Sequence, residues 1–255
     1  MAYGFDALSW CDLKQAYAEA KGAAARVAWL TSQSCGCDPG NLRVYDIMMF
    51  EEEENGVEFQ YVPFTGSAKR IMAGSLMVGA PREGLLPYAQ VGINDSMVTG
   101  RQNYTALHEI IHYHVDVPQG YKGESFSSLL NHGKYSPEEQ FREARSNFGA
   151  AILHIPLQAM VASIKAHKDL REGFSSEFAT SYGNSFTRVR NFLVMDLNIK
   201  WAYANRVVDD YRADPYSPIM EELIDKIIEE YPLDIAGVRL DGDHSVMMDF
   251  NDPFE

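Results

Sequence analysis

The sequence has no long hydrophobic run, few cysteines and a shortage of basic residues, and each absence excludes a class of protein. No stretch of the 255 residues approaches the roughly 18 to 20 apolar residues of a membrane-spanning helix. Residues 1–12 lack the basic segment and the continuous apolar core of a secretory signal peptide. Three cysteines, an odd number, do not make a disulfide framework. We therefore expect a cytoplasmic protein that does not associate with a membrane.

The charge balance argues against a nucleic-acid partner. The chain carries 22 Lys and Arg against 36 Asp and Glu, a net charge of −14. Nucleic-acid binders need a basic face that displaces the counterions of the phosphate backbone, so no direct binding of DNA or RNA is expected. Hydrophobic residues at 46% and charged residues at 23% are ordinary for a globular protein. The length is compatible with one compact unit over residues 1–255.

The most informative segment is residues 108–112, which read His-Glu-Ile-Ile-His. On a helix, His108 and His112 lie one turn apart on the same face and can bind a single Zn²⁺. Glu109 follows the first histidine and lies beside the metal, where it can take a proton from a water and pass it to a leaving amine. The alternative is a core helix that carries two partly exposed histidines.

The flanking residues predict a helix around this motif. Thr99 and Gln102 have the spacing of a capping box, and Pro118 and Gly120 lie where the helix should end. An apolar stripe at helical spacing comprises Tyr104, Leu107, Ile111 and Val115.

Glu143 is the candidate for a third ligand. Residues 136–139, Ser-Pro-Glu-Glu, predict the start of a second helix, and Pro156 predicts its end. Two imidazoles and one carboxylate leave a fourth position open, as catalytic zinc sites require. Asn147, one turn after Glu143, can accept the N–H of a ligand histidine. Glu139, one turn earlier, is the competing ligand, and a solvated acidic face is the alternative for the whole segment.

These residues resemble the core of the ImmA/IrrE-type zinc metallo-endopeptidases. Residues 93–94 (Ile-Asn) and 101–112 (Arg-Gln-Asn-Tyr-Thr-Ala-Leu-His-Glu-Ile-Ile-His) are similar to that family's strand "I-x-N" and helix "R-Q-x-[FY]-T-x-[AL]-H-E-[LI]-x-H". Residues 143–156 are similar to its second helix, "E-x-x-A-N-x-F-A-x-x-L-L-M-P", so that Glu143 matches the metal-binding glutamate and Asn147 the asparagine. The resemblance spans about residues 85–195.

This chain departs from the family pattern at positions that are not ligands. Ser146 replaces the alanine, Gly149 the phenylalanine, and residues 154–155 (His-Ile) the final Leu-Met. The resemblance implies a zincin-like metallopeptidase core of the type His-Glu-x-x-His…Glu, with zinc held by His108, His112 and Glu143. Many relatives fuse a helix-turn-helix module to the peptidase. Here residues 6–29 predict one long helix instead, so a repressor on a separate chain is the expected client.

A metallopeptidase also needs a donor to the oxyanion that forms during hydrolysis. Tyr113, His132 and Tyr135 are the candidates, and the sequence does not choose among them. His114 lies two residues after His112 and is expected to point away from the metal.

The remaining pattern predicts an α+β fold, with a small, mostly antiparallel sheet packed on the metal-binding helices and extra C-terminal helices. The helix and sheet are expected in residues 1–100, the metal-binding helices in 101–160, and a helical region in 161–255. Expected strands are 42–50, 57–64, 71–78 and 88–93, the first two joined as a hairpin at Asn55-Gly56. A helix is expected over 218–231 and a terminal hairpin over 238–250.

Three functions fit this sequence. The first is a zinc endopeptidase of narrow specificity that cleaves a regulatory protein such as a transcriptional repressor. The second is a regulatory protein that retains the metallopeptidase scaffold and binds a partner without cutting it. The intact Glu109 favours the first, because a scaffold needs the ligands but not the base. A metal hydrolase that acts on a small amide is the third.

Overall fold

The computed structural model describes residues 5–66, 72–79, 89–119, 125–129 and 135–230. The chain divides into two compact units, Met1–His154 and Ile155–Glu255, where the sequence suggested one. The expected terminal hairpin and His132 lie outside the described residues. The first unit contains the motif histidines and Glu143.

The first unit is built on a mixed β-sheet. Its strands, in spatial order β1-β3-β2-β4, are β1 (Val57–Val62), β3 (Ala89–Asn94), β2 (Met72–Val78) and β4 (Ser125–Leu129). β2 is antiparallel to both of its neighbours, whereas β1 and β3 are parallel. Among the described strands, two of the three pairings are therefore antiparallel. Val91 of β3 faces Phe59 on one side and Leu76 on the other, in a strand that is almost entirely buried.

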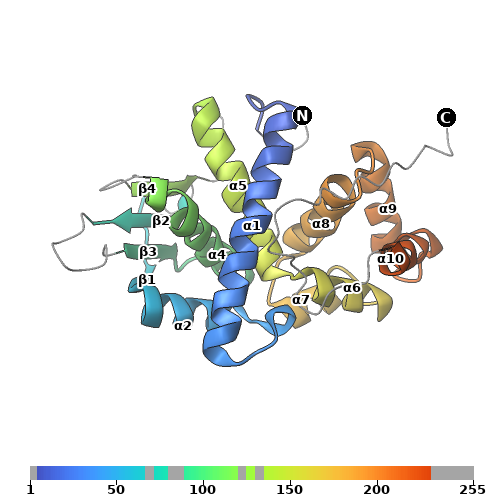
Figure 1. Cartoon of the computed structure of the whole chain (residues 1–255), viewed down its shortest axis with the longest axis horizontal. Coiled ribbons are helices and arrows are strands. Elements are labelled where there is room, and N and C mark those ends of the chain that lie inside the picture. Colours follow the sequence, from blue (N-terminus) through green and yellow to red (C-terminus); the bar gives the residue numbers. More distant parts are fainter. Residues whose placement is uncertain (1–4, 67–71, 80–88, 120–124, 130–134, 231–255) are drawn as a thin grey trace. The chain divides into compact units, whose positions relative to one another are not determined.

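Helices pack on this sheet and against one another (Figure 1). Those of the first unit are α1 (Trp10–Cys35), α2 (Val44–Asn55), α4 (Thr99–Val115) and α5 (Pro137–His154), with short 3-10 turns at Pro39–Asn41 and Val117–Gln119. α4 packs on β2 and β3, and α5 packs on both α4 and α1. One core cluster joins α1, α2, α4 and α5: Ala24, Val27, Ile47, Leu107, Ile110, Ile111, Ala150 and Leu153. The expected single long N-terminal helix is confirmed as α1, with its ends shifted toward the C-terminus.

The strand expected at residues 42–50 is wrong, because this segment belongs to α2. Ile47 and Phe50 are buried and Val44 packs against the same core, which is helical spacing rather than alternation. The side chain of Asp46 accepts the N–H of Arg43 and helps to start the helix. Gly56 ends it in the left-handed conformation, φ 65°, with its N–H bonded to Glu51. Asn55-Gly56 is therefore a helix C-cap and not a hairpin turn.

The two ligand-bearing helices begin differently. The capping box expected in α4 is absent, because Val98 is the N-cap and the Gln102 amide donates instead to the carbonyl oxygen of Asp95 at 3.1 Å. The start expected for α5 at residues 136–139 is confirmed, and it forms a capping box: the N–H of Ser136 donates to the Glu139 carboxylate at 2.7 Å, and the N–H of Glu139 to the Ser136 hydroxyl at 3.3 Å.

Two glycines allow close packing around α4. A Cβ on Gly149 of α5 would lie 2.7 Å from Cγ1 of Ile111. A Cβ on Gly74 of β2 would lie 2.4 Å from Cγ2 of Thr105 and 3.4 Å from Oε1 of Glu109. The first glycine therefore sets the spacing between α4 and α5, and the second the spacing between α4 and the sheet.

The described residues of the second unit form helices joined by short loops, with no strand among them. Its helices are α6 (Leu157–Lys165), α7 (Glu172–Phe178), α8 (Tyr182–Asn191), α9 (Trp201–Ala213) and α10 (Pro218–Glu230), with a π turn at Phe192–Asp196. Phe174, Phe192 and Tyr211 are the largest side chains buried in its core. α10 confirms the helix expected from residue 218.

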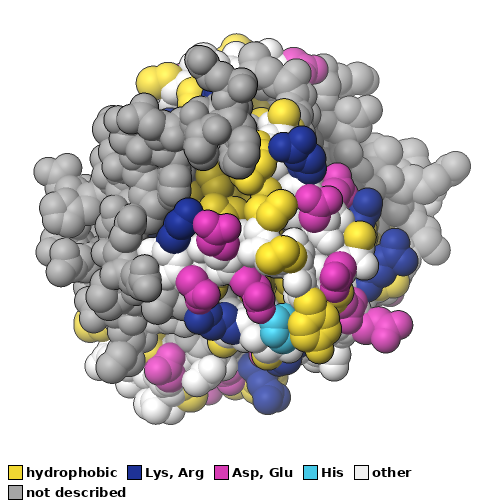
Figure 2. Space-filling model, turned by 90° about the vertical axis from the view of Figure 1, so that its right-hand side faces the viewer, with side chains coloured by type: hydrophobic (Ala, Val, Ile, Leu, Met, Phe, Trp, Pro, Cys, Tyr) yellow, Lys and Arg dark blue, Asp and Glu magenta, His cyan; other side chains and the backbone are white. Residues whose placement is uncertain are grey.

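Surface charges of both signs pair on the second unit. Ion pairs join Lys165 to Asp225 at 2.7 Å and Lys226 to Glu222 at 3.1 Å. Figure 2 shows a face of the molecule on which acidic and basic side chains are interspersed around hydrophobic ones.

None of the described helices taken singly has the length and apolar character to cross a membrane, although α5 and α6 together meet that test as a bent pair.

Candidate metal centre

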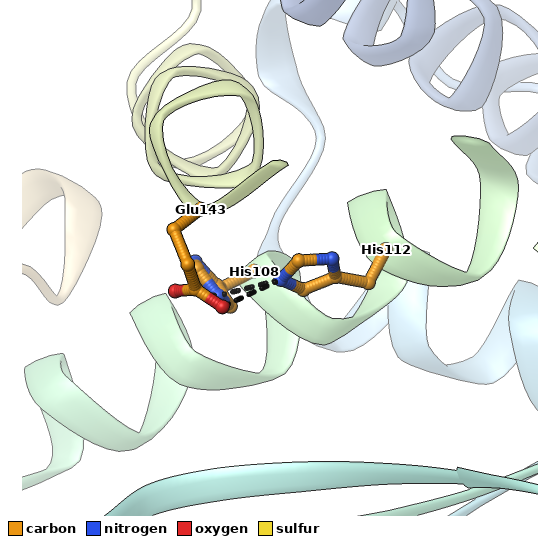
Figure 3. Close-up of side chains that lie close together, drawn as sticks. All are labelled: His108, His112 and Glu143. Atoms are coloured by element: carbon orange, nitrogen blue, oxygen red, sulfur yellow. Dashed lines mark hydrogen bonds and ion pairs between the residues drawn. The ribbon is translucent and has the colours of Figure 1, made fainter. Parts of the chain in front are cut away.

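Three buried side chains from two helices converge at one point of the first unit. His108 and His112 project from successive turns of α4, and Glu143 reaches them from α5 (Figure 3). The Nε2 atoms of His108 and His112 lie 3.0 Å apart. Glu143 Oε2 lies 3.4 Å from His108 Nε2, and Oε1 lies 3.4 Å from His112 Nε2. Among the described residues, this is a group whose ligand atoms could hold a metal ion.

These separations fit a tetrahedral zinc site. Zinc–ligand bonds of about 2.0–2.2 Å at tetrahedral angles place neighbouring ligand atoms about 3.3–3.6 Å apart. The carboxylate–imidazole separations agree with that value, and the two imidazole nitrogens are only slightly closer. Glu143 Oε2 is buried and has no hydrogen bond of good geometry, so it is an acceptor that a cation would satisfy. The residues present therefore fit a divalent metal held by three protein ligands.

The electrostatics of the site also favour a cation. Burial alone would lower the pKa of His112, but hydrogen bonds to Asp116 and Glu143, with the charges of Glu143 and Glu109, raise it to about 10. Burial would raise the pKa of Glu143, but the two histidines hold it well below its ordinary range. Without a metal, His112 is therefore held as an imidazolium. A metal ion that binds Nε2 must displace the proton on that nitrogen.

Glu109 lies on the side of α4 that faces the sheet. It is fully buried, and its Oε1 is next to Gly74 of β2. Its negative charge contributes to the raised pKa of His112. The structure thus places the Glu109 carboxylate between α4 and the sheet.

The outer contacts of the ligands differ from the sequence expectation. Asn147 does not accept a hydrogen bond from either ligand histidine. Its backbone carbonyl and its Oδ1 accept instead from the hydroxyl of Tyr104, at 2.9 and 3.1 Å. The partner of His112 is Asp116, whose Oδ2 lies 2.6 Å from Nδ1. Since Asp116 follows His112 by four residues on the same helix, the i, i+4 spacing could have identified it.

Glu139 is not part of the metal group. Its carboxylate caps the start of α5, and the hydrogen bonds from Ser136 lower its pKa. Glu143 is therefore the carboxylate that the structure brings to the histidines.

Of the three oxyanion candidates, Tyr113 is directed away from the ligands. The hydroxyl of Tyr113 donates to the backbone carbonyl of Asn55 at 3.3 Å, on the side of α4 that faces α2. Tyr135 lies at the start of α5, where its backbone carbonyl accepts from Gln140, and His132 lies outside the described residues. His114 is paired with Glu51 at 2.7 Å, which agrees with its expected direction away from the metal.

No family model matches this chain, and no curated protein matches it. The ImmA/IrrE resemblance thus rests on the motif residues alone.

Proposed function

We propose that this chain is a zinc-dependent endopeptidase of narrow specificity with a zincin-like core. The observation that carries the proposal is the convergent His108–His112–Glu143 group, together with the buried Glu109 carboxylate, whose negative charge acts on His112. A metal-binding scaffold needs the three ligands but has no use for this additional buried carboxylate.

The roles of the residues follow from their chemistry. His108, His112 and Glu143 would hold zinc and leave a fourth coordination position for water or substrate. When bound, zinc supplies a Lewis acid for the scissile carbonyl and lowers the pKa of a water. Glu109 accepts a proton at its carboxylate and returns it to the leaving amine. Asp116 accepts the Nδ1–H of His112, which leaves Nε2 directed at the metal.

The client in this proposal is a regulatory protein in the cytoplasm, such as a helix-turn-helix repressor on a separate chain. The net charge of −14 supports a basic client, because long-range attraction raises the rate of encounter with a protein of opposite charge. It equally disfavours direct contact with DNA.

One observation favours the alternative of a regulatory protein that binds without cutting. His108, Glu109, His112 and Glu143 are all at most 6% exposed. Burial of this degree suits a metal that stabilises the fold, because such a metal needs no access for a substrate.

The substitution Glu109→Gln separates these functions, because it keeps the size of the side chain and removes the base. Wild-type and variant proteins, both loaded with zinc, would be incubated with a proteome-derived peptide library, and new termini would be mapped by mass spectrometry. We expect sequence-selective cleavage by the wild type, almost none by Glu109→Gln, and equal zinc content. Glu53→Gln, a surface change in the same unit, is the control and should cleave normally. If zinc-loaded wild type cleaves no more than Glu109→Gln does, the peptidase proposal is wrong.

A further inference from the structure

A line of buried polar contacts runs from the metal centre to the N-terminal helix. It begins with the contact between His112 Nδ1 and Asp116 Oδ2, at 2.6 Å. The other oxygen of Asp116 accepts from Nη2 of Arg145 at 2.5 Å, and Nη1 of Arg145 donates to Glu19 of α1 at 2.7 Å. Three helices, α4, α5 and α1, thus each contribute to one network.

Burial makes each charge in this network dependent on the next. Asp116 is fully buried and Arg145 is 3% exposed. A buried ion without its partner is strongly destabilising, so neither charge would be tolerated alone. The planar guanidinium bridges the two carboxylates with separate nitrogens, an arrangement that an ammonium group does not reproduce.

The buried charges around the site, which do not include the partly exposed Glu19, balance when a divalent cation is included. Three fully or almost fully buried carboxylates, of Glu109, Asp116 and Glu143, carry three negative charges. Arg145 supplies one positive charge and a divalent cation supplies two. Arg145 is therefore an electrostatic component of the metal centre, although it does not touch the ligand atoms.

We propose that Asp116 and Arg145 are positioning residues of the metal centre, and that Glu19 fixes them from α1. This inference rests on the proposed binding of zinc by His108, His112 and Glu143, and does not depend on peptidase activity. Asp116 holds His112 in the tautomer and ring orientation that direct Nε2 to the metal. Arg145 holds the Asp116 carboxylate, and Glu19 holds Arg145. The metal affinity of a site in α4 and α5 therefore depends on a residue of α1.

A matched control exists at another buried carboxylate, Glu51 of α2, which pairs with a different histidine of α4. Glu51 is fully buried and pairs with His114 of α4 at 2.7 Å, as Asp116 pairs with His112. His114 is not a ligand, however. Asp116→Asn and Glu51→Gln thus make the same chemical change beside two histidines of one helix, and only the first should alter the metal centre.

The test measures the Zn²⁺ dissociation constant by competition with a chelating dye, and the visible spectrum of the Co²⁺-loaded protein. Outer-shell partners typically contribute about 10- to 100-fold in metal affinity, so Asp116→Asn should weaken zinc binding by that factor and change the Co²⁺ spectrum. Glu51→Gln should lower the melting temperature of the metal-free protein but leave both metal readouts unchanged. Arg145→Lys should weaken zinc binding, because an ammonium group cannot bridge Asp116 and Glu19 as the planar guanidinium does. Glu19 is partly exposed, so Glu19→Gln should fold normally. This variant should weaken zinc binding by a few-fold.

The inference is overturned if Asp116→Asn weakens zinc binding no more than Glu51→Gln does, or if Glu19→Gln leaves the affinity and the spectrum unchanged. A wild-type protein that binds no zinc overturns it together with the proposed function. Zinc binding that depends on Asp116 in a protein that cleaves nothing leaves this inference standing and refutes the peptidase. If Asp116→Asn cleaves normally and its zinc affinity is unchanged, this inference is refuted and the peptidase proposal stands.

Discussion

Gly149 offers a test of how the two ligand-bearing helices are held together. A Cβ at this position would lie 2.7 Å from Cγ1, 2.8 Å from Cδ1 and 3.1 Å from Cγ2 of Ile111. Carbon atoms in good contact are about 3.5–4.0 Å apart, so the added methyl overlaps this side chain by about 1 Å. Ile111 is fully buried in the core between α1, α4 and α5, so it has no free space to move into. Gly149→Ala should therefore push α5 away from α4.

Two opposing terms set the magnitude. Replacing glycine by alanine inside a helix gains about 0.5–1 kcal/mol, because the unfolded chain loses freedom. Overpacking of a core costs about 1–3 kcal/mol. We expect Gly149→Ala to be destabilised by about 1–2 kcal/mol on balance. Because Glu143 is on the displaced helix, its distance from the histidines should increase and zinc affinity should fall.

Urea unfolding of the metal-free protein and dye competition for zinc measure the two effects. Ile111→Ala alone should cost about 2–5 kcal/mol, because it leaves a cavity. In the double variant the new methyl enters that cavity, so the combined loss should be smaller than the sum of the single losses. The reasoning is refuted if Gly149→Ala is at least as stable as wild type and binds zinc equally well.

Two further predictions concern the ligands. Glu143→Ala should abolish tight zinc binding. Glu139→Ala should keep its zinc but lose about 0.5–2 kcal/mol of stability, because it removes the cap of α5. Dye competition measures the first effect and urea unfolding the second, and equal loss of zinc in the two variants would show that the ligand is misassigned. The pKa of His112 in the metal-free protein is raised from 6.5 to about 10, so the stability gained from its protonation is fully present below pH 6.5 and is lost as pH rises through about 10. Zinc must displace this proton, so binding at pH 7 should release about one proton from His112, as calorimetry in buffers of different ionisation enthalpy would measure; binding without proton release would contradict the raised pKa.

The sequence predicted the ligand helices well because their signals are local. The i, i+4 spacing of His108 and His112 fixes them to one face of α4 without reference to the rest of the chain. The Ser136 cap fixes the start of α5, and Glu143 then follows as the acidic residue at the edge of its apolar run.

Contacts between helices were predicted poorly because they depend on how each helix is rotated. Asn147 shares a face with Glu143, as expected, but α5 is turned so that this asparagine meets Tyr104 instead of a histidine. Residues 42–50 were misread because their β-branched and aromatic residues favour a strand locally. Burial against α1 and α4 stabilises a helix in this segment. That burial cannot be predicted from the local sequence pattern.

The pairing of α1 with α5 has a consequence for the order of folding. Glu19 and Arg145 are 126 residues apart, whereas Tyr104 and Asn147, which join α4 to α5, are 43 apart. Closing the longer loop costs about 1 kcal/mol more in chain entropy, so the pair of ligand helices can form before α1 docks. During synthesis, α1 emerges before α5, and more than a hundred residues must follow it before its inner face can pack against α5. The alanines on that face (Ala16, Ala20, Ala24 and Ala25) expose less apolar area in the interval than larger side chains would, so that Leu13, Tyr17 and Val27 supply most of the apolar area that is exposed until α5 is made.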